Sequence, residues 1–309
     1  MSSISQPIVV SRGGMALLRD YSELVKARIT MLIVISAWCG FYCGAARSEV
    51  SSLSWTLVNA LLGIALVSAG TAGMNEVMER DIDARMQRTA RRPLVTQTMS
   101  VQHAALVSIA MIVGGTVYLG FTCNILTAAL TFATSFVYLG FYTPLKTVSP
   151  ICTFIGAIPG AMPPVLGWAA VRGRLDWEAF VLFAILFFWQ FPHFHSIALL
   201  YRDDYRRAGI RMLPVVERSG RTTADAIVFY SLALLAVTLA PTLLGMTGYT
   251  YFFSALVLGL WVLMAGLKIW RARLDPDLPE AKVLARNLLK TTVFYLPLLF
   301  AIMMLNIVS

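Results

Sequence analysis

The sequence predicts an all-α, polytopic membrane protein with about nine transmembrane helices. Of the 309 residues, 58% are hydrophobic and 13% are charged, whereas a soluble globular chain is about 45–50% apolar and about 25% charged. Apolar stretches close to the ~20 residues that a helix needs to cross a bilayer recur along the whole chain. The alternation of polar and apolar residues that a transmembrane β-barrel requires is absent. These observations exclude an ordinary soluble enzyme, a disordered protein and a disulfide scaffold.

The first four predicted spans follow an N-terminal segment of 28 residues. This leader is long and contains Asp20 and Glu23, so an uncleaved first helix explains it better than a signal peptide does. A long charged loop separates the second span from the third, and a tight uncharged turn around Thr122 separates the third from the fourth. The four spans are 29–46, 54–74, 100–120 and 122–142.

The remaining five spans include one that is interrupted. Gly156, Gly160, Pro163 and Pro164 lie within it, so its helix either packs closely against a neighbour or is broken beside a cavity. A second long charged loop follows the sixth span, and a tight turn at Gly248 joins the seventh to the eighth. The five spans are 150–171, 176–199, 225–246, 249–270 and 291–308.

The distribution of basic residues predicts the orientation. Of the 25 lysines and arginines, only Arg47, Arg172 and Arg174 fall on one side of the predicted topology. The other side, which holds the N-terminus, is therefore expected to be cytoplasmic, with the C-terminus outside. The net charge of +9 then serves orientation in the membrane, not binding of nucleic acid. We divide the chain into a cytoplasmic N-terminal segment, 1–28, and a single transmembrane domain, 29–309, with functional loops at about 75–99 and 200–224.

A first candidate site follows the second span. Asn75, Glu79 and Asp83 are four residues apart and therefore share one helical stripe. Two carboxylates and an amide oxygen are hard ligands that suit Mg²⁺, whose other positions are filled by water and substrate phosphates. A salt-bridged helix end explains the same spacing, although ionisable groups clustered beside a bilayer tend to be functional. Four arginines that could hold the outer oxygens of a diphosphate come next: Arg85, Arg88, Arg91 and Arg92.

A second candidate lies on the same side, at the end of the sixth span. His193 and His195 are two residues apart in an apolar helix and therefore point to different faces. An imidazole there is a haem contact, an acid or base, or a hydrogen-bonded interhelical residue. Asp203 and Asp204 follow among arginines. If the helix continued, the ten residues from His193 to Asp203 would span about 15 Å.

A third candidate is the short inner loop between the fourth and fifth spans. It reads Tyr142-Thr143-Pro144-Leu145-Lys146, and Lys146 is its single charge. Lysine is a good point-charge partner for phosphate. Lysines that snorkel at helix ends are also routine, so the loop is informative only together with the other two candidates.

These motifs resemble the UbiA superfamily of intramembrane prenyltransferases, and within it the branch that farnesylates protoheme IX. The superfamily's first motif, N-x-x-x-D-x-x-x-D, matches Asn75, Glu79 and Asp83, with Glu in place of the first Asp. The branch's continuation, R-D-I-D-x-x-M-x-R-T-x-x-R-P, matches 80–93, and the resemblance covers roughly 20–305. Further matches are Tyr142, Thr143, Lys146, Gly156, Gly160, Pro163-Pro164, Pro192-His193-Phe194, Asp203-Asp204-Tyr205, Ala208-Gly209-Ile210 and 212–216. The chain departs from the wider superfamily in its second motif, D-x-x-x-D, because its two aspartates are adjacent.

The resemblance implies a nine-span prenyltransferase fold in a bacterial cytoplasmic membrane, surrounded by membrane lipids. The implied reaction transfers a farnesyl group from farnesyl diphosphate to a vinyl group of haem B, with Mg²⁺ as the cofactor. A functional link to a haem A synthase or a terminal oxidase is a further expectation. The implied metal ligands are Asn75, Glu79 and Asp83, which are catalytic together with Lys146. The implied substrate-binding residues are Arg80, Arg88, Arg92, Tyr142, His193, Asp203, Asp204 and Tyr205.

Two alternatives stay open at the level of sequence. The residues themselves do not distinguish haem from another acceptor, so a sibling prenyltransferase that uses an aromatic acid or a chlorophyllide is the nearest alternative. A transporter also has many spans and broken helices. It fits less well, because transporter sites lie near the membrane midplane, whereas the ionisable clusters of this chain lie at one face.

Overall fold

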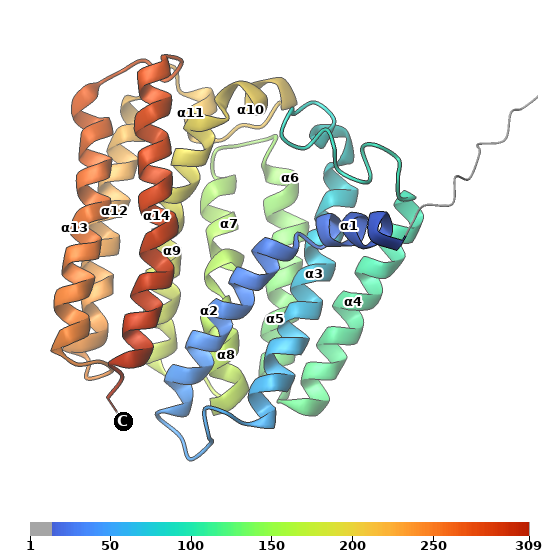
Figure 1. Ribbon diagram of the computed structural model, residues 1–309, viewed down its shortest axis with the longest axis vertical. Coiled ribbons are helices and arrows are strands. Elements are labelled where there is room, and N and C mark those ends of the chain that lie inside the picture. Colours follow the sequence, from blue (N-terminus) through green and yellow to red (C-terminus); the bar gives the residue numbers. More distant parts are fainter. Residues whose placement is uncertain (1–13, 309) are drawn as a thin grey trace, which may run out of the picture.

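A computed structural model describes residues 14–308 of the chain (Figure 1). Residues 1–13 and 309, and with them Arg12 of the basic N-terminal segment, lie outside the described residues. Within the described part, every regular element is helical, and one isolated bridge joins Thr247 to Ile307. In chain order the helices are α1 (Gly14–Leu24), α2 (Ala27–Ala45), α3 (Trp55–Asp83), α4 (Val101–Thr122), α5 (Ile125–Val137), a π-helical turn (Tyr138–Tyr142), α6 (Thr143–Leu145), α7 (Cys152–Ala161), α8 (Pro163–Arg172), α9 (Trp177–Leu200), α10 (Arg202–Ala208), α11 (Leu213–Val216), α12 (Arg221–Leu243), α13 (Tyr249–Ala272) and α14 (Pro279–Leu305).

Nine helical segments of the described chain are long and apolar enough to cross a membrane, which confirms the predicted number. Their bounds differ from the prediction where a helix continues past its apolar stretch. The last helix begins at Pro279 instead of 291, and α3 continues to Asp83 instead of ending near 74. Hydropathy marks the part of a helix that lies in lipid, and both helices extend beyond that part.

Three helices that begin after turns are capped by serine or asparagine side chains, which are residue types that favour this position. The Ser54 hydroxyl accepts a hydrogen bond from the Leu57 amide at the start of α3, and the Ser100 hydroxyl accepts one from the His103 amide at the start of α4. The Asn124 carboxamide accepts one from the Thr127 amide, which lets α5 begin directly after the tight turn at Thr122. Each cap satisfies an amide that the helix itself leaves unpaired.

Small residues bring α2 and α8 into contact near the centre of the bundle. A Cβ atom on Gly40 would lie 1.9 Å from the carbonyl oxygen of Pro164, and one on Gly167 would lie 1.8 Å from that of Ala37. No side chain fits at either position, so the two helices pack backbone against backbone. To one side of this contact, α9, α12, α13 and α14 pack together (Figure 1).

The interrupted fifth span is both broken and closely packed. Its two halves, α7 and α8, meet at Met162, just before the proline pair. Gly156 lies under the ring of Tyr142, where a Cβ atom would be 2.6 Å from that ring. Gly160 gives the same room to Gln190, whose amide donates to the Ala157 carbonyl at 3.0 Å. The two glycines therefore admit two polar side chains into the interior.

One end of the bundle carries all three predicted functional segments (Figure 1). α1, the 84–99 segment, α6, α10 and α11 lie at that end, and the described C-terminal end lies at the opposite one. Met86 of the 84–99 segment packs with Tyr205 and Ala208 of α10. The Arg211 amide donates to the Lys146 carbonyl at 2.7 Å. The predicted loops thus pack against one another as one layer.

The helix that carries His193 does not continue to Asp203. α9 ends at Leu200, and α10 begins at Arg202 after Tyr201 adopts a non-helical backbone. The condition for a 15 Å helical path between the two residues is therefore not met, because the chain turns at Tyr201.

Candidate active site

Three predicted ligands lie on the last turns of α3, in the interior of the functional end. Asn75, Glu79 and Asp83 are 0%, 6% and 1% exposed. The spacing of four residues places them along one stripe of α3, which stays helical as far as Asp83. Burying carboxylates is costly unless a cation accompanies them.

Each of the three side chains meets a cation from a different segment. Lys26 Nζ donates to Asn75 Oδ1 at 2.6 Å, and Lys146 Nζ donates to Glu79 Oε1 at 2.6 Å. The guanidinium of Arg92 forms an ion pair with the Asp83 carboxylate. The site is therefore a stripe of oxygen donors faced by three positive side chains that are far apart in the sequence.

Lys26 was not among the residues that sequence reasoning selected for the site. It lies between α1 and α2 with a φ of 46°, a left-handed backbone that is uncommon for a non-glycine residue. Burial, with repulsion from Arg92 and Lys146, lowers the pKa of Lys26 to about 7. In the sequence Lys26 is one of several basic residues before the first span, so nothing distinguishes it from an anchor of that span.

Glu76 is a second residue that sequence reasoning missed. It is 0% exposed, and within residues 14–308 neither carboxylate oxygen has a hydrogen-bond partner. The nearest cation is Arg92, whose Nε lies 4.0 Å from Glu76 Oε2. A carboxylate next to Asn75, just past the end of the predicted span, was the signal that could have identified it.

Lys146 and Tyr142, from the short loop after the fourth span, form one wall of the site. Lys146 Nζ lies 4.4 Å from the centroid of the Tyr142 ring, a cation–π distance. Burial opposes the charge of Lys146, yet Tyr142, Tyr138 and Glu79 together hold its pKa above the ordinary value. The Asn75 amide donates to the Thr143 hydroxyl at 3.1 Å, which ties α3 to this wall. The predicted Tyr142 and Lys146 thus adjoin the predicted ligands.

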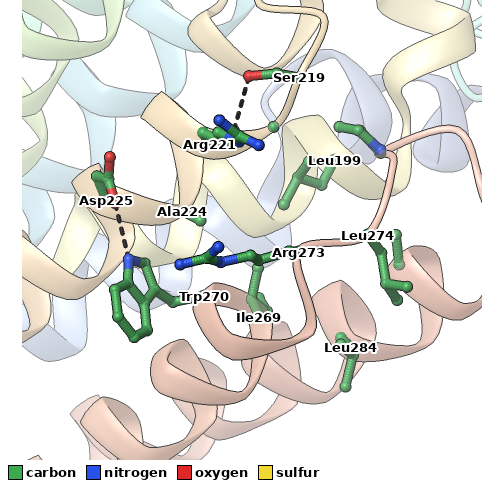
Figure 2. Close-up of a pocket in the computed structure, with 13 residues that line it drawn as sticks. Leu199, Ser219, Arg221, Ala224, Asp225, Ile269, Trp270, Arg273, Leu274 and Leu284 are labelled. Carbon is green, nitrogen blue, oxygen red and sulfur yellow. Dashed lines mark hydrogen bonds between the residues drawn. The ribbon is translucent and has the colours of Figure 1, made fainter.

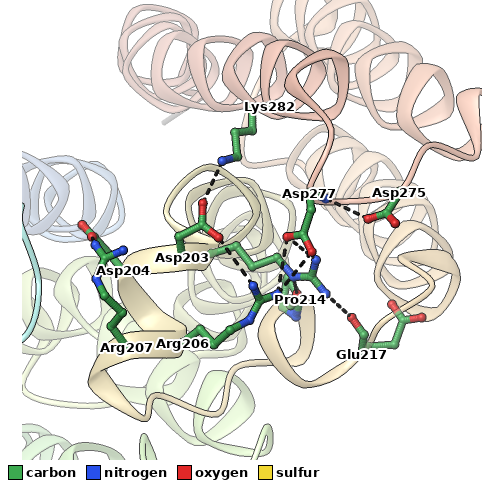
Figure 3. A network of polar contacts seen from close by, with 10 residues as sticks. Asp203, Asp204, Arg206, Arg207, Pro214, Glu217, Asp275, Asp277 and Lys282 are labelled. Atoms are coloured by element: carbon green, nitrogen blue, oxygen red, sulfur yellow. Dashed lines mark hydrogen bonds and ion pairs between the residues drawn. The ribbon is translucent and has the colours of Figure 1, made fainter.

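The two adjacent aspartates of the second loop point in different directions (Figure 3). Asp203 accepts a hydrogen bond from Lys282 of α14 at 2.9 Å, and this bond holds the pKa of Asp203 below its usual range. Asp204 instead forms an ion pair with Arg207 and accepts a 3.4 Å hydrogen bond from the Arg88 amide. Asp204 therefore contacts the segment that follows α3, whereas Asp203 anchors α10 to α14.

Other predicted substrate-binding residues have different positions relative to the stripe. Tyr205 is buried beside Met86. The Arg88 guanidinium lies 5.5 Å from the centroid of the Tyr201 ring, toward the second loop. Arg80 is about half exposed and pairs with the exposed Asp81, so it does not join the three cations of the stripe.

His193 adjoins α14 in the interior. Its Nδ1 lies 3.0 Å from the Thr292 hydroxyl, and its ring stacks on that of Trp189 with 4.5 Å between centroids. Nε2 has no hydrogen-bond partner among the described residues. The Nδ1 contact thus joins α9 to α14.

The donor set fits a hard cation. Among residues 14–308, no group of three His, Cys, Asp or Glu side chains is already arranged as a metal cage. The stripe nevertheless offers an amide oxygen and two carboxylates, and Glu76 adds two buried oxygens that accept no hydrogen bond from the described part of the chain. Donors of this kind suit Mg²⁺ when a phosphorylated substrate supplies further oxygens. The three cations that now neutralise the stripe have the charge to accept such a substrate.

The chain matches a known family and many of its members. The model of the UbiA prenyltransferase family matches residues 33–290. The chain is 62% identical to a protoheme IX farnesyltransferase of Koribacter versatilis, with 99% of each chain covered. It is 44% identical to a protoheme IX farnesyltransferase of Solibacter usitatus, over 94% of this chain and 99% of that one.

Solved structures share the fold at low sequence identity. A digeranylgeranylglyceryl phosphate synthase superposes with a TM-score of 0.76 at 16% identity, covering 94% of this chain and 99% of that chain. A UbiA homologue from Archaeoglobus fulgidus, bound to GPP and Mg²⁺, superposes with a TM-score of 0.61 at 17% identity, covering 92% of this chain and 99% of that chain. These two structures establish the fold.

Proposed function

Since the chain belongs to the UbiA prenyltransferase family, and its relatives at 62% and 44% identity are protoheme IX farnesyltransferases, we propose that it transfers a farnesyl group from farnesyl diphosphate to a vinyl group of haem B. The products are haem O and diphosphate. The single observation that carries the assignment is the full-length 62% identity. The geometry of the α3 stripe supports the diphosphate half of the reaction independently.

The buried stripe and its three cations are suited to bind a diphosphate. We propose that Asn75, Glu79 and Asp83 hold Mg²⁺, as the Mg²⁺-bound UbiA homologue and the oxygen donors of the stripe support. When bound, Mg²⁺ supplies positive charge to the bridging region of the diphosphate. Lys26, Lys146 and Arg92 then exchange their present contacts with the stripe for contacts with the outer diphosphate oxygens. Arg92 can do so with two parallel hydrogen bonds.

Ionisation of the allylic C–O bond follows from this arrangement. Negative charge grows on the departing diphosphate as that bond breaks, and preorganised positive side chains lower the barrier most where charge develops. The ring of Tyr142, held over Gly156, borders the same space and helps to exclude water from the carbocation. The vinyl group of the acceptor attacks C1 of the farnesyl group. A water oxygen then bonds to the resulting cation beside the porphyrin and releases a proton, which leaves a hydroxyethylfarnesyl side chain.

We also propose a position for the haem acceptor. We place haem B below the diphosphate, toward His193, because this imidazole lies within α9 and its Nε2 has no hydrogen-bond partner among residues 14–308. We also propose that the functional end faces the cytoplasm of a bacterium, as the positive-inside rule favours. A link to an enzyme that consumes haem O, a haem A synthase or a terminal oxidase, follows from the product.

The test is turnover by the purified protein in lipid nanodiscs with haem B, farnesyl diphosphate and Mg²⁺, followed by chromatography of the haems. We expect conversion of haem B to a more hydrophobic haem whose mass increases by one farnesyl group and one hydroxyl group. Parallel reactions with 4-hydroxybenzoate as the acceptor should give no prenylated product. Prenylation of the benzoate without conversion of haem would assign the chain to the sibling activity.

A further inference from the structure

A cavity lies at the functional end of the bundle, on the flank formed by α9, α12, α13 and α14 (Figure 2). It has a volume of about 230 Å³. None of its lining residues belongs to the α3 stripe or to the three cations that face it. The cavity is therefore separate from the proposed active site.

The floor of the cavity is apolar and its rim is basic. Leu199 of α9, Ile269 of α13 and Leu284 of α14 form the apolar part. Arg221, at the start of α12, and Arg273, just after α13, line the same space. Among residues 14–308, neither guanidinium has a hydrogen bond or an ion pair. Two unpaired guanidinium groups over an apolar floor are complementary to an anion that is attached to an apolar chain.

The one carboxylate that lines the cavity is engaged elsewhere. Asp225 accepts a hydrogen bond from the indole nitrogen of Trp270 at 2.8 Å (Figure 2). This contact ties α12 to α13, and among residues 14–308 Asp225 forms no ion pair with either arginine. Trp270 is 40% exposed, at the end of a membrane-length helix where tryptophans characteristically mark the lipid headgroup region.

Arg273, which lines the cavity, has a left-handed backbone conformation. Its φ is 47°, a left-handed conformation at a helix end where glycine is the common residue. A non-glycine residue in this conformation is strained. In Figure 2 the Arg273 side chain extends from this turn among the residues that line the cavity.

We propose that this cavity binds the phosphate headgroup of an anionic phospholipid. Arg221 and Arg273 hold the phosphodiester oxygens, and the Leu199, Ile269 and Leu284 side chains contact the glycerol and the first methylenes of the acyl chains. A free phosphate ion would use the same arginines. The apolar floor and the interfacial Trp270 favour the lipid, and basic pockets between transmembrane helices are characteristic sites for anionic headgroups.

The test is native mass spectrometry of the detergent-solubilised full-length protein titrated with phosphatidylglycerol or with phosphatidylcholine. We expect one phosphatidylglycerol to bind at least about 10-fold more tightly than phosphatidylcholine. The double variant Arg221→Gln/Arg273→Gln should lose this preference. The matched control Arg271→Gln/Arg286→Gln removes the same charge from exposed positions at the same end, outside the cavity, and should keep it.

A cavity-filling variant and a competition with inorganic phosphate complete the test. Ala281→Trp fills the cavity while both arginines stay, so it should also abolish preferential binding, and it serves if the double arginine variant does not fold. Equal losses in the cavity and control variants would overturn the proposal, because general surface charge would then explain the binding. Retention of the preference in Ala281→Trp would overturn it too. Displacement of the lipid by equimolar inorganic phosphate would identify a free anion as the ligand and contradict the lipid assignment.

Discussion

Lys26 and Asn75 are joined by a hydrogen bond of 2.6 Å between Nζ and Oδ1, although 49 residues separate them. The bond brings the junction of α1 and α2 onto the first member of the α3 stripe. Lys26 is therefore a wall of the proposed diphosphate site. Its position brings the end of the N-terminal segment into the proposed site.

The first prediction concerns this lysine. Lys26→Ala should raise the KM for farnesyl diphosphate about 10- to 100-fold, because a hydrogen bond to a charged group contributes about 1.5–3 kcal/mol. Lys26→Arg keeps the positive charge and should lose less. The exposed Arg28, two residues later, provides the control, and Arg28→Ala should leave KM unchanged. Equal KM values for Lys26→Ala and wild type would remove Lys26 from the site.

The second prediction concerns the two carboxylates of the stripe. Glu79→Gln and Asp83→Asn should each lower kcat by about 10²–10³, the range found when one electrostatic group of a catalytic site is removed. Both changes keep the shape of the side chain, so insertion and folding should be preserved. Asp81→Asn alters an exposed carboxylate of the same turn and should have little effect. Near-wild-type turnover in either stripe variant at limiting Mg²⁺ would refute the assignment.

Arg92 gives the third prediction, which separates charge from geometry. Arg92→Lys retains the charge but loses the planar fork, so kcat/KM should fall about 10-fold. Arg92→Gln removes both and should be more damaging, since the buried carboxylates of Asp83 and Glu76 then lack a cation. Steady-state kinetics in nanodiscs measures the difference. The proposed role is wrong if Arg92→Gln has the wild-type kcat and KM.

The fourth prediction addresses the buried carboxylate of Glu76. If its oxygens support the Mg²⁺ site, Glu76→Gln should raise the half-saturating Mg²⁺ concentration about 10-fold or more, as loss of a supporting group around a metal does. The amide is isosteric, so thermal unfolding should change little. An unchanged Mg²⁺ dependence together with lower thermal stability would give Glu76 a purely structural role.

The fifth prediction distinguishes two roles for His193. If Nε2 contacts haem, His193→Ala should change the Soret spectrum of bound haem B and weaken haem binding, with farnesyl diphosphate affinity preserved. Thr292→Val removes only the partner of Nδ1 and should change haem binding less. If both variants lower thermal stability equally and the Soret band stays unchanged in both, the histidine only joins α9 to α14.

Residue spacing and prolines predicted those features of the protein that depend only on neighbouring residues in the chain. Asn75, Glu79 and Asp83 share a stripe because helical spacing is a property of the sequence itself, and the break at Met162 follows from the prolines beside it. Lys26 could not be selected, because its contact with Asn75 depends on where α1 and α2 cross α3. The same limit explains Asp203 and Asp204, whose neighbours on α14 and on the 84–99 segment decide where each carboxylate points. The early start of α14 at Pro279 was missed because polar helical turns carry no hydropathy signal.

The most direct test of the central claim is equilibrium binding of a non-ionising analogue, farnesyl thiodiphosphate, to wild type and to Glu79→Gln, with and without Mg²⁺. We expect Mg²⁺-dependent binding to wild type that falls at least about 10-fold when the metal is chelated or when Glu79 is changed to Gln. Binding that is equally tight without Mg²⁺, or equally tight in Glu79→Gln, would contradict the claim that the α3 stripe holds the metal–diphosphate.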